Sequence, residues 1–167
     1  MRKRTSVAVS VVMGSDSDLS VMEEAAKILE AFAIPYELFL TSAHRTPERT
    51  TQFARSAAGR GIRVIIVGAG AAAHLAGVIA AQTPLPVIGV PIDATSLHGL
   101  DALLATVQMP GGIPVATMAI GKAGAKNAAL FSVRILAGGN ADLSARLDAY
   151  IAKMAEDVEK KQLNLKK

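Results

Sequence analysis

Short apolar runs alternate with helical segments along most of this chain, and that alternation limits the possible folds more than any other feature. The five runs, rich in β-branched and other apolar residues, are Val7–Met13, Tyr36–Leu40, Val64–Val67, Val87–Val90 and Val115–Met118. Strands that alternate with helices pair in parallel, and right-handed crossovers then place helices on both faces of one sheet. The pattern therefore predicts an α/β fold built on a parallel five-stranded sheet.

Helix signals occupy the segments between these runs. Asp18 can cap a helix that ends near Ala33 before Pro35, and Thr46 with Pro47 can begin the next helix. Further helices are expected near residues 75–82, 98–107 and 124–138. A final amphipathic helix, with apolar residues at spacings of three and four, includes Leu143, Leu147, Tyr150, Ile151, Met154 and Val158.

The length and composition predict one domain that associates with copies of itself. We expect a single domain over residues 1–167, with a core at about 6–138, a C-terminal helix at about 141–160 and a charged tail at 161–167. Apolar residues make up 51% of the chain and charged residues 19%, against a usual charged share of about 25%. Because a small monomer needs more charged surface than this, we predict a homo-oligomer that buries apolar surface between subunits.

The composition also argues against several classes of protein. The chain has no Cys, which excludes disulfides, thiolate catalysis and Cys-based zinc sites. Part of the basic excess behind the net charge of +4 lies at the two ends, and no aromatic residues interleave with it. Solvated termini explain that pattern better than a nucleic-acid surface, so no nucleic-acid partner is expected.

Nothing in the sequence predicts a membrane partner. No apolar stretch reaches the length of about 20 residues that a membrane span needs. The run Val7–Met13 is short for a signal peptide and leads into GSDSD instead of a small-residue cleavage site. We therefore expect a cytoplasmic protein.

Polar or glycine-rich loops follow the first three apolar runs, and they are Gly14–Asp18, Thr41–Arg45 and Gly68–His74. Ligands of open parallel sheets bind outside the carboxyl ends of the strands, where the strand order reverses. The three loops are therefore expected to converge on one binding site.

The first two loops have features of a phosphate site. The GSDSD loop combines backbone N–H groups with the Ser15 hydroxyl, and Arg45 can donate two hydrogen bonds to a phosphate. Asp18 would then face sugar hydroxyls or a protonated group. The alternative interpretation is structural, with Ser15–Asp18 as a turn and helix cap and Arg45 as a surface residue.

His44 and His74 are the candidate acid–base residues, because a histidine changes its protonation state near neutral pH. A lone histidine is more often structural, but two on one sheet edge favour a catalytic interpretation. No Cys or cluster of carboxylates accompanies them, so no metal site is expected. His98, at a predicted helix start, is interpreted as a surface or capping residue.

The GAGAAA segment that begins at Gly68 offers a rival interpretation. It matches the G-x-G-x-x-A pattern of dinucleotide sites, and Asp93 follows after another strand. However, it follows the third strand instead of the first, and Pro84 and Pro86 leave only a short helix before Asp93. The chain is also too short to add a substrate domain.

Taken in order, the motifs resemble a known family. The segments VMGSDSD, SAHRTPER, GAGAAAHLAG, PVIGVPI and LLATVQMPGGIPVATMAIGKAGAKNAAL are similar to those of the N5-carboxyaminoimidazole ribonucleotide mutases, also known as the catalytic subunit of phosphoribosylaminoimidazole carboxylase. The resemblance covers roughly residues 6–150, and the motifs are jointly much more specific than any one alone.

The resemblance implies a flavodoxin-like three-layer α/β/α sandwich and a homo-octamer. It implies the reversible conversion of N5-carboxyaminoimidazole ribonucleotide to 4-carboxy-5-aminoimidazole ribonucleotide in de novo purine (IMP) synthesis, with no metal and no cofactor. His44 and His74 match the family's active-site histidines. The matching substrate-binding residues are Ser15, Asp18, Ser42, Arg45, Gly70, Ala71 and Ala72.

The sequence departs from the commonest family pattern at three positions. Ala76 replaces a usual Pro, Ala102 a usual Ser, and His98 a small polar residue.

Three alternative functions compete with the mutase interpretation. The nearest is that of the CO2-using carboxylase branch of the same superfamily, which typically has Lys where this chain has Arg45. The others are a phosphate-binding regulator and a flavodoxin-like binding module for FMN or a nucleotide, although stacking aromatics are scarce.

Overall fold

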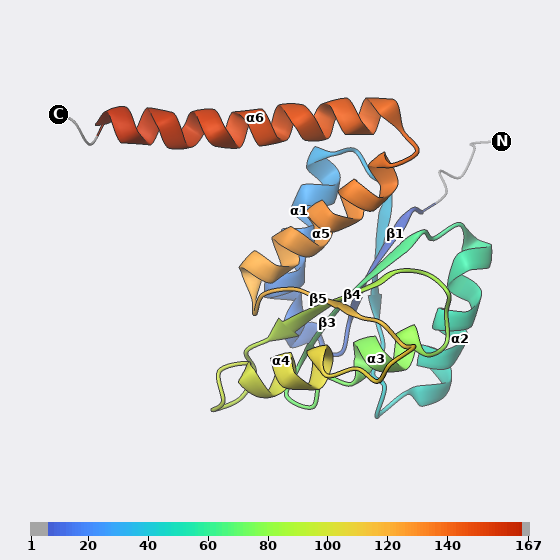
Figure 1. Ribbon diagram of the computed structural model, residues 1–167. Helices are drawn as coiled ribbons and strands as arrows, with labels where there is room; N and C mark the ends of the chain where they lie inside the picture. Colours follow the sequence, from blue (N-terminus) through green and yellow to red (C-terminus); the bar gives the residue numbers. More distant parts are fainter. Residues whose placement is uncertain (1–6, 165–167) are drawn as a thin grey trace. The chain divides into compact units, whose positions relative to one another are not determined.

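Five parallel strands form a single sheet in the order β2-β1-β3-β4-β5 (Figure 1). The computed structural model describes residues 7–164. Its strands are β1 (Val9–Met13), β2 (Tyr36–Leu40), β3 (Val64–Gly70), β4 (Val87–Ile92) and β5 (Ala116–Thr117). This strand order is that of flavodoxin-like doubly wound sheets, with helices on both faces, so the predicted fold class is confirmed.

The helices follow the strands in alternation, as the sequence predicts. They are α1 (Leu19–Ala31), α2 (Pro47–Ala57), α3 (Leu75–Ala80), α4 (Leu100–Val107), α5 (Lys122–Ala137) and α6 (Ala141–Asn164). Two 3-10 turns, Asp16–Asp18 and Ala58–Arg60, lie beside α1 and α2. Among the helices of residues 7–164, none combines the length and the apolar character that crossing a membrane requires.

Several predicted boundaries were wrong by a few residues, for identifiable reasons. Helix α4 begins at Leu100 and not at 98, because His98 and Gly99 take left-handed backbone angles, with φ of 50° and 82°. Helix α6 continues to Asn164, so residues 161–164 are helical and do not belong to a tail. The rest of the predicted tail, 165–167, lies outside the described residues.

Strand β1 is an interior strand of the sheet, since it pairs with β2 on one side and β3 on the other. All five of its residues are buried. That burial explains why the run is apolar without alternation, as expected for a strand covered on both faces. The reversal of strand order beside β1 places its carboxyl end, Met13–Gly14, at the position where doubly wound folds bind ligands.

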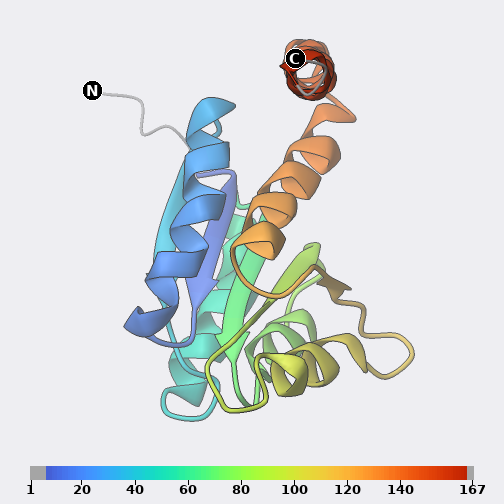
Figure 2. The ribbon, with the colours of Figure 1, turned by 90° about the vertical axis from the view of Figure 1, so that its left-hand side faces the viewer.

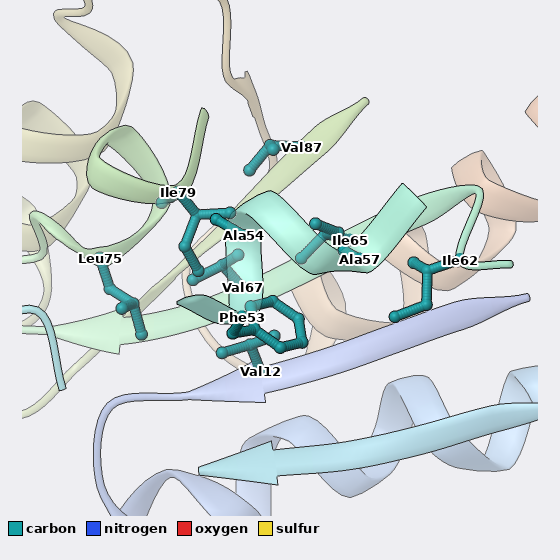
Figure 3. Close-up of a cluster of buried hydrophobic side chains, with 11 residues drawn as sticks. Val12, Phe53, Ala54, Ala57, Ile62, Ile65, Val67, Leu75, Ile79 and Val87 are labelled. Carbon is teal, nitrogen blue, oxygen red and sulfur yellow. The ribbon is translucent and has the colours of Figure 1, made fainter. Parts of the chain in front are cut away.

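One face of the sheet packs against α2 and α3 through a contiguous apolar cluster (Figure 3). Phe53 of α2 and Ile79 of α3 are buried there against Val12, Ile65 and Val67 of the sheet. Burying side chains of this size stabilises the fold by about 1.5–3 kcal/mol each. The cluster, which includes Val12 of β1 and Val67 of β3, therefore fixes the ends of the two strands that lead into the first and third polar loops.

Helix α1 covers the opposite face, and Figure 2 shows it running alongside β1. A Cβ on Gly68 of β3 would lie 2.4 Å from the Met22 sulfur, so only glycine lets α1 pack this closely. The first turns of α5 lie beside α1, where Lys126 pairs with Glu24 at 3.2 Å. The three layers thus bury all of β1 and residues 64–68 of β3.

The chain divides into two compact units, the first ending at Ser132 and the second beginning at Val133, within α5. The first unit contains the whole sheet and every predicted site residue. The second contains the end of α5 and all of α6. The expectation of a single domain over the whole chain stays a prediction.

Candidate active site

A cavity of about 330 Å³ lies at the carboxyl ends of β1, β2, β3 and β4. Every predicted site residue except His74 lines it, namely Ser15, Asp18, Ser42, His44, Arg45, Gly70, Ala71 and Ala72. The three loops do converge, as expected from the strand-end rule, by which ligands of open parallel sheets bind outside the carboxyl ends of the strands. A larger hollow of about 630 Å³ lies along the outer side of α2, but it brings no separate loops together.

The first loop is held by a reciprocal cap between Ser15 and Asp18. The Ser15 hydroxyl accepts a hydrogen bond from the Ser17 N–H, and the Asp18 carboxylate accepts one from the Ser15 N–H at 3.0 Å. The prediction that Asp18 caps α1 was wrong in this detail, since its side chain makes no cap bond to that helix. The capping residue is Ser15, because a 3-10 turn precedes α1.

Burial raises the pKa of Asp18 above its usual 3.8, and this is the largest effect on the group. The N–H groups of Ser15 and Gly14 lower its pKa, and the charge of Asp16 raises it. The residue is only 5% exposed. A carboxyl in this setting suits contact with neutral hydroxyls better than contact with an anion.

Arg45 connects the second loop to the first. Its Nη2 donates to the Gly14 carbonyl at 3.1 Å, and the Ser42 hydroxyl accepts from the Arg45 backbone N–H at 3.1 Å. The guanidinium is therefore held over the end of β1 before any ligand binds. Its Nε also donates to the Ser42 hydroxyl, at 3.5 Å, and the remaining N–H groups on Nη1 and Nη2 can donate to an anion in the cavity.

Thr46 behaves differently from the sequence prediction, although α2 does begin at Pro47 as expected. Its side chain makes no cap bond to α2. Its hydroxyl instead accepts from the Ser42 N–H at 3.0 Å and lies 3.2 Å from the Thr41 hydroxyl. These bonds close the loop that carries His44 and Arg45 into a tight turn.

His44 and His74 contact each other directly across the end of the sheet. Nε2 of His44 lies 2.9 Å from Nδ1 of His74. The pair is edge to face, with ring centroids 5.0 Å apart. His44 lines the cavity and His74 does not, so the structure joins the two predicted histidines as a contacting pair of which one member faces the cavity.

The third loop turns sharply between β3 and α3. Ala71 has a φ of 52°, an uncommon backbone conformation for a residue with a side chain. A Cβ on Gly70 would lie 2.5 Å from the Ala94 Cβ, so the backbone there approaches the next loop closely. This geometry presents backbone groups of residues 70–72 to the cavity.

The dinucleotide interpretation of this loop fails on its geometry. A pyrophosphate site needs a helix N-terminus immediately after the glycines. Here β3 continues through Gly70, and the next helix, α3, begins only at Leu75 and has six residues.

The remaining candidates lie outside the cavity lining. His98 is exposed, with Nδ1 3.7 Å from an Asp93 carboxylate oxygen. Within residues 7–164 the structure holds no group of three His, Cys, Asp or Glu side chains arranged for a metal ion.

Two residues beyond the three predicted loops, Ala94 and Leu75, line the cavity and were missed by the sequence prediction. Ala94 follows the fourth apolar run, so the strand-end rule could have found it.

The fold and the loops define an α/β protein with a cavity at the sheet's switch point, beside a pair of histidines. Residues 8–157 match the family described as AIR carboxylase, and the chain belongs to that family. The family predicted from the motifs is thereby confirmed.

Relatives at high identity carry the mutase name. The chain is 57% identical to the N5-carboxyaminoimidazole ribonucleotide mutase of Pyrococcus horikoshii over 157 residues, which cover 94% of this chain and 88% of that protein. It is 52% identical to the mutase of Synechocystis over 159 residues, covering 95% and 89%. The crystal structure of Treponema denticola PurE superposes with a TM-score of 0.86 at 27% identity, covering 96% of this chain and 99% of that one.

Proposed function

We propose that this enzyme interconverts N5-carboxyaminoimidazole ribonucleotide and 4-carboxy-5-aminoimidazole ribonucleotide in purine synthesis, with His44 as the proton carrier. The isomerase activity follows from the family and from the mutase relatives. The observation that supports the role of His44 is its 2.9 Å contact with His74, on the wall of the cavity that Arg45 and the Ser15 loop share.

The substrate binds with its charged end toward the first two loops. Arg45 and the hydroxyls of Ser15 and Ser42 receive the phosphate, and Asp18 faces the ribose hydroxyls. The imidazole lies against the backbone of residues 70–72, which a ring can approach closely because no large side chain intervenes. This orientation brings the carbamate nitrogen and the ring carbon C4 toward His44.

The chemistry then needs one acid–base group and a closed space. His44 gives a proton to the carbamate nitrogen as the nitrogen–carbon bond breaks, with its electron pair going to nitrogen, and CO2 is released. C4 attacks that CO2, and His44 removes the proton that C4 carried. Holding CO2 in the cavity makes recapture effectively intramolecular and stops its loss to water. His74 keeps the His44 ring in place, and the reaction needs no metal or cofactor.

A cytoplasmic homo-oligomer, specifically an octamer, completes the proposal. An apolar stripe, comprising Leu100, Leu104 and Val107, runs along α4 with each residue 48–52% exposed. The spacing of three and four places these side chains on one side of the helix. Light scattering tests the assembly, because Leu104→Lys should reduce the mass of the particle. Leu104→Met, which keeps an apolar side chain, is the control. A wild-type protein with the mass of a monomer contradicts the proposed assembly.

The decisive experiment measures the carboxylated imidazole product in a coupled assay. Wild-type protein should convert the carbamate substrate much faster than it carboxylates 5-aminoimidazole ribonucleotide with bicarbonate. His44→Asn should abolish conversion, since general acid–base groups contribute about 10²–10⁴-fold, while still binding the nucleotide. Near-normal turnover by that variant rules out His44 as proton carrier, and preference for bicarbonate assigns the chain to the carboxylase branch.

A further inference from the structure

A second cavity, of about 350 Å³, adjoins the active-site cavity. The two share Gly14, Ser15, Ser42 and Arg45 in their walls. The second also reaches Thr46 and Arg49. Arg49 is the last residue of the SAHRTPER motif and lies four residues after Arg45, but no site prediction above includes it.

We propose that Arg49 is a second phosphate-binding residue, and that Arg45 and Arg49 hold the substrate phosphate between them in this adjoining cavity. The inference rests on the proposed function, because it assigns one part of the same substrate to a place. Arg45 lies on the wall common to both cavities, so a ribonucleotide can place its ring in one and its phosphate in the other.

The position of Arg49 suits this role. It lies in the first turn of α2, and its guanidinium stands 5.0 Å above the centroid of the Phe39 ring. A ring supports the flat face of a guanidinium and leaves the N–H groups at its edge free to donate. The side chain is therefore steadied by an apolar contact that does not use its hydrogen-bonding capacity.

The charges of the cavity favour a phosphate. Within residues 7–164, no carboxylate lies at ion-pair distance from Arg45 or Arg49. The lining includes one carboxylate, Asp16, whose Oδ1 already accepts from the Ser15 hydroxyl and the Ser17 N–H. Two guanidinium groups against one carboxylate leave a positive cavity that a phosphate can neutralise.

The first cavity is less suited to the phosphate. Apart from the first two loops, its walls come from the small residues of the third loop, with Leu75 and Ala94. Such a lining matches a flat heterocycle. It also keeps the histidine pair away from the strongest negative charge of the substrate.

Binding of ribose 5-phosphate and of the uncharged 5-aminoimidazole riboside tests the inference by calorimetry. Arg49→Gln should weaken ribose 5-phosphate binding about tenfold or more, since a charge-assisted hydrogen bond is lost. It should leave riboside binding within about twofold of wild type. Arg49→Lys should fall between Arg49→Gln and wild type, because lysine keeps the charge but not the fork.

Arg63→Gln is the matched control, because Arg63 is an exposed arginine at the amino end of β3 and lines neither cavity. An Arg49→Gln variant that binds ribose 5-phosphate as Arg63→Gln does overturns the inference. If Arg49→Gln fails to fold, the difference between Arg49→Lys and wild type carries the same test. Arg49-dependent binding by a protein without carboxyl-transfer activity supports this inference and refutes only the proposed reaction.

Discussion

Nε2 of His44 and Nδ1 of His74 are 2.9 Å apart, and the two rings meet at 85°. One of these nitrogens must donate and the other accept, so a single proton lies between the rings and each ring fixes the tautomer of the other. The residues come from different loops, thirty positions apart. The pair therefore forms only when the ends of β2 and β3 are held in register on either side of β1.

Replacing His74 should slow the reaction without preventing binding. We expect His74→Asn to lower kcat about 10²-fold, because the His44 ring loses the contact that positions it. KM should change much less, since His74 does not line the cavity. Steady-state kinetics give both values, and ¹⁵N NMR of the imidazole nitrogens reports the tautomer of His44. An unchanged kcat with a mobile His44 ring would show that the contact has no role in turnover.

Arg45 should act mainly on substrate affinity. Arg45→Ala removes a charged donor of the phosphate site, and we expect KM to rise about tenfold or more. The change also removes the bond to the Gly14 carbonyl, so Arg45→Lys is needed as a control that keeps the charge. Initial-rate measurements over a wide substrate range separate the two effects. A KM equal to that of wild type in both variants counts against a phosphate role.

Asp18 should make the stability of the protein depend on pH with a definite sign. Because its folded pKa is raised above 3.8, the folded state keeps the proton to a higher pH than the unfolded chain does. The contribution of Asp18 to stability is therefore complete below about pH 3.8 and falls as the pH rises through the folded pKa.

Urea unfolding of wild type and Asp18→Asn at fixed protein concentration measures this contribution. The free energy of unfolding of wild type minus that of the variant should decrease from pH 3.5 toward neutrality. Taking the difference removes the titration of the other carboxyl groups, and the fixed concentration removes the effect of assembly. A difference that grows with pH would mean that the Ser15 and Gly14 N–H groups outweigh burial.

Ala71 should tolerate glycine better than most residues do. Its φ of 52° is strained for alanine and free for glycine. The relief of strain opposes the entropy that glycine adds to the unfolded chain, so we expect a change in unfolding free energy between about 0 and +1 kcal/mol. Thermal unfolding measures it, with Ala73→Gly as a control at an ordinary backbone angle. Destabilisation of Ala71→Gly as large as that of Ala73→Gly would contradict this account.

The architecture could be predicted from the sequence because the two features that determine it, the apolar runs of the strands and the residues that begin and end the helices, are local. The apolar runs of β1, β3 and β4 are strands buried along most or all of their length, whereas the edge strands β2 and β5 are only partly buried. The helix between successive strands begins and ends with residues such as Pro47 and Pro35, which act on the neighbouring backbone. The loops that line the cavity followed from the same pattern, since parallel strands end at one edge. Even Ala94 obeys that rule.

What the sequence left open depends on three-dimensional contacts. The distance between His44 and His74 is set by the register of two strands, which no local pattern encodes. The caps expected from Asp18 and Thr46 were wrong because each side chain found a partner in its own loop and not at the helix it precedes. The adjoining cavity could not be predicted from the sequence either, since nothing in the local pattern distinguishes Arg49 from other charged residues on the surface of a helix.

The Ser15 loop is held by bonds among its own residues, since Asp18 accepts from the Ser15 N–H and the Ser15 hydroxyl accepts from the Ser17 N–H. A ligand that binds there does not have to offset the conformational entropy of ordering the loop. Encounter and release can then be fast, and the affinity reflects the contacts themselves. The amide hydrogens of Ser15, Ser17 and Asp18 should accordingly exchange slowly even in nucleotide-free protein.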